Sequence, residues 1–262
     1  MTNNKKTFEE KIAEDLTKTG LPTEITVHKI LLKRGWDVKS QYSFLDKEGS
    51  IRSCDFYASY YGDLISDELD DRYICQLFIE CKKSNKPWVF YTGPALENNL
   101  EEHLAALFEP IKYKRNINNK EIYNSLEKIK NIHDNVHCEI AYFYQIPFIK
   151  QKSESEYRDI LYAAEMQVLK AIFYTKPMSK NIIGYINIYP LIVFNGNMFK
   201  CDLIEDKLKV TKINYVRYSS SGIPESKIDV LIDVITLDYL DTYLEYVETE
   251  VFPKTKPSRI KK

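Results

Sequence analysis

The sequence predicts an α/β domain, because segments with helical and with strand periodicity alternate along one chain of 262 residues. The first part carries apolar residues at helical spacing. After Gly35 the pattern changes to short segments rich in β-branched and aromatic residues. We find no internal repeat and no low-complexity linker in the sequence. A single domain over residues 1–262 is therefore expected, with an insertion or subdomain at 95–151 and a flexible basic tail at 253–262.

Two helices are expected at the start of the chain. The first rests on apolar residues that recur every four positions: Phe8, Ile12 and Leu16. This spacing predicts an amphipathic helix over Thr7–Thr19. A second helix is expected from Pro22 to Gly35, because proline suits the first helical turn and glycine suits a helix C-terminus.

The next segments are typical of strands. Four of them follow the second helix: Trp36–Leu45, Ile51–Tyr61, Tyr73–Cys81 and Trp88–Tyr91. They are short, rich in β-branched and aromatic residues, and separated by turn signals such as Lys47-Glu48-Gly49. We therefore expect a meander of three strands, to which Trp88–Tyr91 could add a fourth.

The middle of the chain is predicted to be helical and the last third to be mixed. The helical segments are Asn98–Phe108, the basic stretch Ile111–Lys130 and the long helix Ser153–Tyr174, with a strand at Cys138–Phe148 between them. Further strands are expected at Ile182–Phe194, Met198–Ile204, Lys207–Tyr218 and Ile228–Thr236, before a closing helix at Leu237–Val251. The Asn195-Gly196-Asn197 turn signal predicts a hairpin between the first two of these strands.

The charge balance argues against a uniformly basic coat protein for nucleic acid. The chain has 37 Lys+Arg and 38 Asp+Glu, a formal net charge of −1. This neutrality averages over segregated charge. Ile111–Lys130 holds six basic and two acidic residues, whereas Asp63–Asp71 holds five acids and no base. A local basic groove that contacts phosphates thus stays open.

The cysteines and the N-terminal stretch favour a cytoplasmic protein. The 5 cysteines are odd in number and widely spaced, and no C-x-x-C motif occurs among them: Cys54, Cys75, Cys81, Cys138 and Cys201. Reduced, buried thiols fit this pattern better than disulfides or a zinc site. Residues 1–14 are polar, and the sequence contains no apolar run of 18 residues, so we expect neither a signal peptide nor a membrane span.

One group of residues carries recognisable chemistry. Asp55 lies within the strand segment Ile51–Ala58, and Glu80 and Lys82 lie two residues apart at the end of the next apolar run. Because strand side chains alternate, Glu80 and Lys82 share one face and Cys81 turns to the other. The same alternation sets Asp55 opposite to both Cys54 and Phe56. If the strands pair, the two carboxylates and the ammonium converge.

This convergence would suit hydrolysis of a phosphodiester bond. Two carboxylates match the preference of Mg²⁺ for one or two protein oxygens plus water and phosphate, and Mn²⁺ is the expected substitute. A lysine beside them could orient or deprotonate a metal-bound water and stabilise charge on the phosphate.

Asp55…Glu80-Cys81-Lys82 resembles the D…(D/E)-x-K signature of the PD-(D/E)XK, or restriction-endonuclease-like, nuclease superfamily. The resemblance covers Pro22 to Tyr91. Members often carry a glutamate on the helix before the first core strand, and Glu24 lies at about that place. Where many members have proline before the aspartate, this chain has Cys54.

The resemblance implies a restriction-endonuclease-like central mixed β-sheet flanked by helices, here with a helical, basic middle insertion. It also implies Mg²⁺-dependent cleavage of double-stranded DNA, in a restriction or phage-defence setting. Asp55 and Glu80 would bind the metal, Lys82 would position the attacking water, and Glu24 would assist. Glu24 could equally be a first-turn acid favoured by the helix dipole.

The expected nucleic-acid contacts are basic residues: Lys83, Lys86, Lys112, Lys114 and Arg115. Two other functions stay open at this point. The chain could be a non-catalytic, nuclease-like module that binds nucleic acid or protein, or a nuclease directed at RNA. A homodimer and a partner subunit of a defence system are likewise open.

Overall fold

The computed structural model describes residues 6–63, 72–93, 140–145, 160–175, 184–220 and 230–250. Its helices are α1 (Phe8–Thr17), α2 (Leu21–Lys33), α5 (Ile160–Tyr174) and α6 (Leu240–Glu250), with a 3-10 turn at Leu237–Tyr239. Its strands are β1 (Asp37–Leu45), β2 (Ile51–Asp63), β3 (Arg72–Lys83), β4 (Trp88–Gly93), β5 (Ile140–Gln145), β6 (Gly184–Asn195), β7 (Met198–Ile204), β8 (Lys207–Ile213), β9 (Tyr215–Ser220) and β10 (Val230–Thr236). The helices predicted over 98–108 and 111–130, and the basic tail, lie outside the described residues.

Within the described ranges, ten strands form one hydrogen-bonded sheet in the order β1-β2-β3-β6-β10-β9-β5-β4-β7-β8. The sheet is mixed: β1, β2 and β3 are antiparallel neighbours, whereas β6 runs parallel to both β3 and β10. The predicted α/β class and the three-strand meander are therefore confirmed. The fourth expected strand, β4, lies outside the meander and pairs with β5 and β7.

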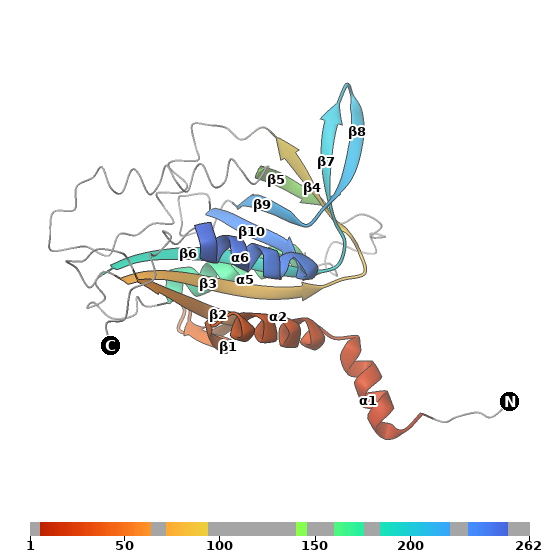
Figure 1. Ribbon diagram of the computed structural model, residues 1–262. Coiled ribbons are helices and arrows are strands. Elements are labelled where there is room, and N and C mark those ends of the chain that lie inside the picture. The colour runs from red at the N-terminus through yellow and green to blue at the C-terminus, as the bar shows by residue number, and fades with distance from the viewer. Residues whose placement is uncertain are drawn as a thin grey trace, which may run out of the picture.

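Helices cover both faces of the sheet and bury two separate apolar clusters (Figure 1). On one face, α5 packs Leu161, Val168 and Leu169 against the meander and β6. On the other face, α2 contributes Val27 and Leu31, and the same cluster includes side chains of α6. The two faces are called here the α5 face and the α2/α6 face.

The second helix follows the sequence signals closely. Pro22 lies in its first turn, and Gly35 follows its C-terminus with a φ of 84°. A carboxylate of α6 fixes this end: Arg34 Nη2 lies 2.7 Å from Glu248 Oε2, and Trp36 Nε1 donates to Glu248 Oε1 at 2.7 Å. These bonds raise the pKa of Arg34 and hold the two helices of this face together.

The hairpin predicted at Asn195-Gly196-Asn197 is wrong. The strands that flank this turn do not pair: β6 lies between β3 and β10, and β7 lies between β4 and β8. Gly196 is needed there for space, because a Cβ atom at this position would lie 2.4 Å from Phe194 Cζ and 2.7 Å from the Ser84 carbonyl oxygen. The turn thus packs against the end of β3 instead of closing a hairpin.

The hairpin in this region joins β7 to β8 through Glu205 and Asp206. Both residues have positive φ, 50° and 60°, as the central residues of a type I′ turn require. Glu-Asp is a weak signal for such a turn, which explains why the sequence pattern favoured the Asn-Gly site. The segment predicted as one strand over 207–218 is interrupted at Asn214 and forms β8 and β9.

Candidate active site

The site lies where two strands of the meander separate. The ladder between β2 and β3 runs from the Asp63–Arg72 pair to the Phe56–Ile79 pair. Beyond it, β2 continues alongside β1 and β3 continues alongside β6. Asp55 and Glu80 occupy the next position on each strand, so both carboxylates lie in the fork.

Where the backbones of β2 and β3 no longer pair, the two carboxylates accept hydrogen bonds from backbone N–H groups instead. The Cys81 backbone N–H donates to Asp55 Oδ2 at 2.8 Å, and the Asp55 backbone N–H donates to Glu80 Oε2 at 3.3 Å. Each acid therefore accepts a bond from the strand that carries the other. The structure brings together the two carboxylates that the sequence predicted as metal ligands.

Lys82 completes the group from the same strand. Its Nζ lies 2.5 Å from Glu80 Oε1, which confirms that Glu80 and Lys82 share a face. The Glu80 side chain is only 2% exposed and that of Lys82 is 21% exposed, so the lysine of this ion pair reaches solvent and the carboxylate does not. Lys82 Nζ also lies 3.4 Å from Gln167 Oε1 of α5.

The sequence reasoning missed Gln167. A signal was available, because it is an uncharged polar residue on a mostly apolar helix whose neighbour Val168 is fully buried. Placing it next to Lys82 needed the packing of α5 across the sheet, which periodicity does not give.

The prediction that Asp55 points away from both Cys54 and Phe56 is wrong. Cys54 packs in the cluster of the α5 face, and Phe56 packs in the cluster of the α2/α6 face. The neighbouring strand β1 changes face at the same level of the sheet. Val38 and Tyr42 are four residues apart and would share a face in a regular strand, but Val38 packs with the α2/α6 cluster and Tyr42 with the α5 cluster.

Gln41 lies at that level of β1 and has a φ of 50°, a left-handed backbone that a side chain makes costly. Its neighbours pair Ser40 with Phe56 and Tyr42 with Cys54, so Gln41 lies across from Asp55. Both strands thus break their alternation together at the site. Strict period-2 reasoning does not anticipate a paired break of this kind.

Glu24 lies in the first turn of α2, near the fork but outside the carboxylate pair. Burial and the negative charge of Asp55 raise its pKa, and Lys82 opposes this effect. Gln41 Nε2 lies 3.5 Å from Glu24 Oε2. Within the described ranges, no set of three or more His, Cys, Asp or Glu side chains is close enough to hold a metal ion. Glu24 is therefore a neighbour of the pair and not a third ligand in this geometry.

Electrostatics favours a cation between the two acids. Burial, followed by the charge of Asp55, raises the pKa of Glu80 to about 7, against the lowering effect of Lys82. Burial also raises the pKa of Asp55, which the Cys81 N–H and Lys82 counteract. One buried and one half-buried acid share a single ammonium group, so ionising both acids leaves one negative charge without a partner cation. Oxygen donors with this excess fit a hard divalent cation such as Mg²⁺, which needs one or two carboxylates.

The remaining predicted contacts are placed as follows. Lys83 is exposed and its Nζ donates to the Thr17 carbonyl oxygen at 2.5 Å, at the C-terminal end of α1. That bond and the helix dipole give Lys83 a structural role. Lys86 is exposed in the loop between β3 and β4. The three basic residues of the middle segment lie outside the described residues: Lys112, Lys114 and Arg115.

Comparison with known proteins gives no neighbour: no family model, curated protein or solved structure matches this chain. In the part of the chain that the structure describes, no helix combines the length and the hydrophobicity that a bilayer crossing needs. The functional argument therefore rests on the site itself.

Proposed function

We propose that the protein is a metal-dependent endonuclease that hydrolyses DNA phosphodiester bonds. The observation that carries the proposal is the fork between β2 and β3, where Glu80 accepts hydrogen bonds from Lys82 and from the Asp55 backbone N–H, and Asp55 accepts one from the Cys81 backbone N–H. A restriction or phage-defence setting follows from the resemblance to PD-(D/E)XK nucleases alone.

Asp55 and Glu80 are the residues that would hold Mg²⁺ or Mn²⁺. When bound, such a cation supplies Lewis acidity and an activated water for attack on phosphorus. The strand backbone orients both carboxylates, because each accepts an N–H from the opposite strand. This bonding fixes the acids before any ligand arrives, which is the kind of preorganisation that catalysis needs.

Lys82 acts on the reacting atoms in this proposal. Glu80 and Gln167 hold its ammonium group, and its side chain is still partly open to solvent. From there it can position the attacking water and stabilise the extra negative charge that develops on the phosphate oxygens. Glu24 contributes negative potential at the rim of the site.

The test is cleavage of duplex DNA by the purified chain with Mg²⁺ or with EDTA. We expect cleavage with Mg²⁺ alone, and a loss of about 10²-fold or more in Lys82→Met. Lys170→Met is the matched control, because it removes another half-buried lysine, on α5, and should retain activity. Equal cleavage by Lys82→Met and the wild type would overturn the proposal.

One observation favours a second candidate, a non-catalytic nuclease-like module. Both carboxylates already accept backbone N–H groups, which is a structural role that needs no metal. Such a module would bind DNA or RNA without cutting either. Running the same assay on single- and double-stranded RNA also separates an RNA nuclease from the proposed DNA nuclease.

A further inference from the structure

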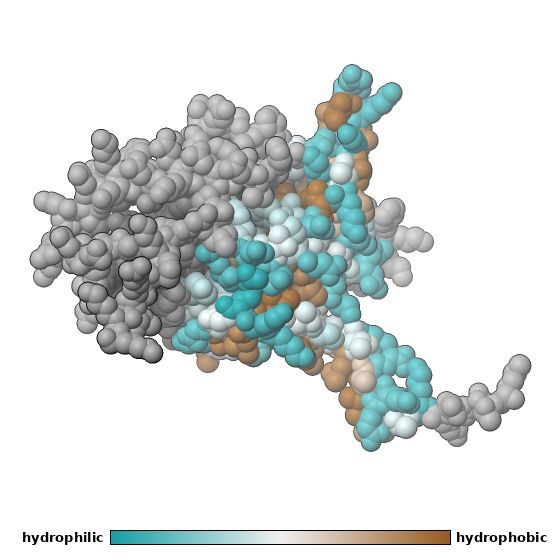
Figure 2. All heavy atoms as spheres, viewed as in Figure 1, coloured by the Kyte–Doolittle hydropathy of each residue, from teal (hydrophilic) through white to brown (hydrophobic). Residues whose placement is uncertain are grey.

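The β7–β8 hairpin projects from the body of the protein as a two-stranded ribbon (Figures 1 and 2). β8 is the last strand of the sheet, and its residues are exposed from Lys207 to Lys212. At a rise of about 3.4 Å per residue, seven residues extend roughly 20–24 Å. The exposure of β8 from Lys207 to Lys212 leaves the side chains of this strand available to a partner.

The two faces of the ribbon differ in chemistry. The pairs Lys200–Thr211, Asp202–Lys209 and Ile204–Lys207 place three lysines and one acid on one face, called here the basic face. Asp202 Oδ2 lies 3.5 Å from Lys200 Nζ, so the charge in excess on this face comes from Lys207 and Lys209 of β8. The pairs Cys201–Val210 and Leu203–Leu208 lie on the other face, where Leu203 is 68% and Leu208 66% exposed. Lys212 belongs to this second face, opposite Phe199.

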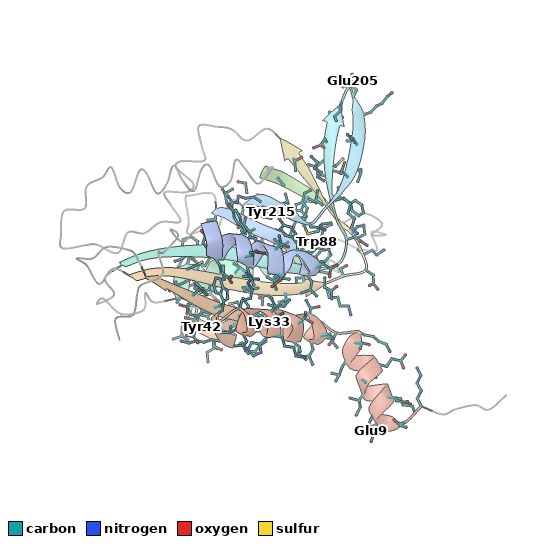
Figure 3. All side chains as sticks on the ribbon, in the orientation of Figure 1. Glu9, Lys33, Tyr42, Trp88, Glu205 and Tyr215 are labelled. Carbon is teal, nitrogen blue, oxygen red and sulfur yellow. The ribbon has the colours of Figure 1, made fainter. Side chains whose placement is uncertain are left out.

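The base of the arm is anchored beside the candidate active site. Lys82 pairs with Phe194 across β3 and β6, and the Phe194 ring stacks on Trp88 at 3.8 Å between centroids. Ser84 N donates to the Asn195 carbonyl oxygen at 3.3 Å, and Trp88 N donates to the Asn197 carbonyl oxygen at 3.0 Å. Figure 3 shows Trp88 near the base and Glu205 at the tip. A partner of the arm would thus also lie near Lys82.

We propose that the basic face of the β7–β8 hairpin binds the phosphate backbone of duplex DNA and positions it for the site; this inference rests on the proposed function. Lys207 and Lys209 project from the same face of an edge strand that carries no acid. A duplex is a polyanion whose major groove admits a two-stranded β-ribbon.

The charge of β8 favours this occupant over a second copy of the chain. Lysines on an edge strand oppose edge-to-edge pairing, because two such edges bring like charges together. Strand pairing with another β8 would set three lysines against three lysines with no acid on either strand. The same charges attract DNA.

The experiment compares two lysines of one strand that differ in the face they occupy. We would measure binding of a labelled DNA duplex in EDTA across a salt series for the wild type, Lys209→Ala and Lys212→Ala. Lys209→Ala is expected to weaken binding several-fold and to reduce the slope of log K against log[salt] by about 0.9, the value for one phosphate contact. Lys212→Ala removes the same charge from the apolar face and should bind as the wild type does.

Equal effects of the two variants, or no effect of either, would overturn the inference. Sedimentation velocity of Leu208→Lys tests whether a second copy of the chain occupies the hairpin instead of DNA. The inference is also overturned if the wild type self-associates, Leu208→Lys abolishes this association, and Lys209→Ala leaves DNA binding unchanged. The two proposals fail separately. Lys82-dependent cleavage without any effect of Lys209→Ala contradicts only the hairpin, whereas Lys209-dependent binding without cleavage contradicts only the nuclease.

Discussion

Two charged groups in the described part of the sheet differ in character. In the first, Asp233 of β10 accepts from Arg217 Nε at 2.9 Å and from Arg217 Nη2 at 3.3 Å. Tyr215 OH donates to its Oδ1 at 3.0 Å, and Tyr243 OH of α6 donates to its Oδ2 at 2.8 Å. One acid is matched by one base and two hydroxyl groups.

The second group, in the fork of β2 and β3, is unbalanced. Burial raises the pKa of both Asp55 and Glu80, and with the charge of Asp55 it brings the pKa of Glu80 to about 7, although Lys82 lowers both values. Burial alone does not separate the two groups, since Asp233 is 4% and Glu80 2% exposed. The difference is that the first group is complete within the protein, and the second retains charge that a cation would neutralise. The first group fits a stabilising role, and the second is the group proposed to bind a cation.

The largest expected effect on stability comes from breaking the complete group. Arg217→Met leaves Asp233 buried without its cation and should lower the free energy of unfolding by about 3–5 kcal/mol. Lys82→Met should cost far less near pH 7, because Glu80 can take up a proton at small cost when its pKa is already about 7. Urea unfolding of both variants in EDTA measures this contrast. Similar losses in the two variants would contradict it.

A second effect is a pH dependence that belongs to Glu80. Its pKa rises from an ordinary 4.5 to about 7, so the folded chain holds a proton that the unfolded chain releases in this window. Protonated Glu80 therefore contributes about 3 kcal/mol to the free energy of unfolding below pH 4.5. This contribution is lost as the pH rises through 7.

Glu80→Gln keeps the acceptor for the Asp55 N–H and removes the titration. Its unfolding free energy, measured in EDTA from pH 4.5 to 8, should exceed that of the wild type increasingly as pH rises. Parallel curves for the two proteins would show that Glu80 titrates normally.

A smaller effect is expected within the complete group. Tyr243→Phe removes one hydroxyl donor to Asp233 and should cost about 1–1.5 kcal/mol. Tyr162→Phe is a control on an exposed tyrosine of α5 and should change stability by less than about 0.5 kcal/mol. DNA cleavage per folded molecule should stay unchanged in both. Reduced cleavage by folded Tyr243→Phe would remove the distinction between the two groups.

The smallest effect is expected at Gln167, a positioning residue for Lys82. Gln167→Ala removes the 3.4 Å contact to Lys82 Nζ and should lower kcat several-fold with KM unchanged. The pH profile of kcat should shift, a change that loss of packing would not produce, and Gln167→Asn should restore part of the rate. A rise in KM alone would assign Gln167 to substrate binding instead.

Strand alternation in the sequence was enough to place Glu80 and Lys82 on one face. Pro22 and Gly35 were enough to predict α2, and segment composition with turn signals was enough to predict the meander. Local signals failed where tertiary contacts decide the geometry. The Asn195-Gly196 turn is shaped by the Phe194 ring of β6 and by the carbonyl of Ser84, the residue that follows β3. Similarly, β1 breaks its alternation at Gln41, which lies across from Asp55, and neither residue alone signals this break.

The central claim is that Asp55 and Glu80 form a divalent-cation site. Calorimetric titration of the chain with Mg²⁺ and with Mn²⁺ tests it directly. We predict saturable binding of either ion by the wild type and by Glu48→Gln, an exposed-acid control, and no binding by Asp55→Asn or Glu80→Gln. Both amide variants keep an oxygen for the backbone N–H groups, so they should stay folded. Binding that persists in folded Asp55→Asn and Glu80→Gln would contradict the account.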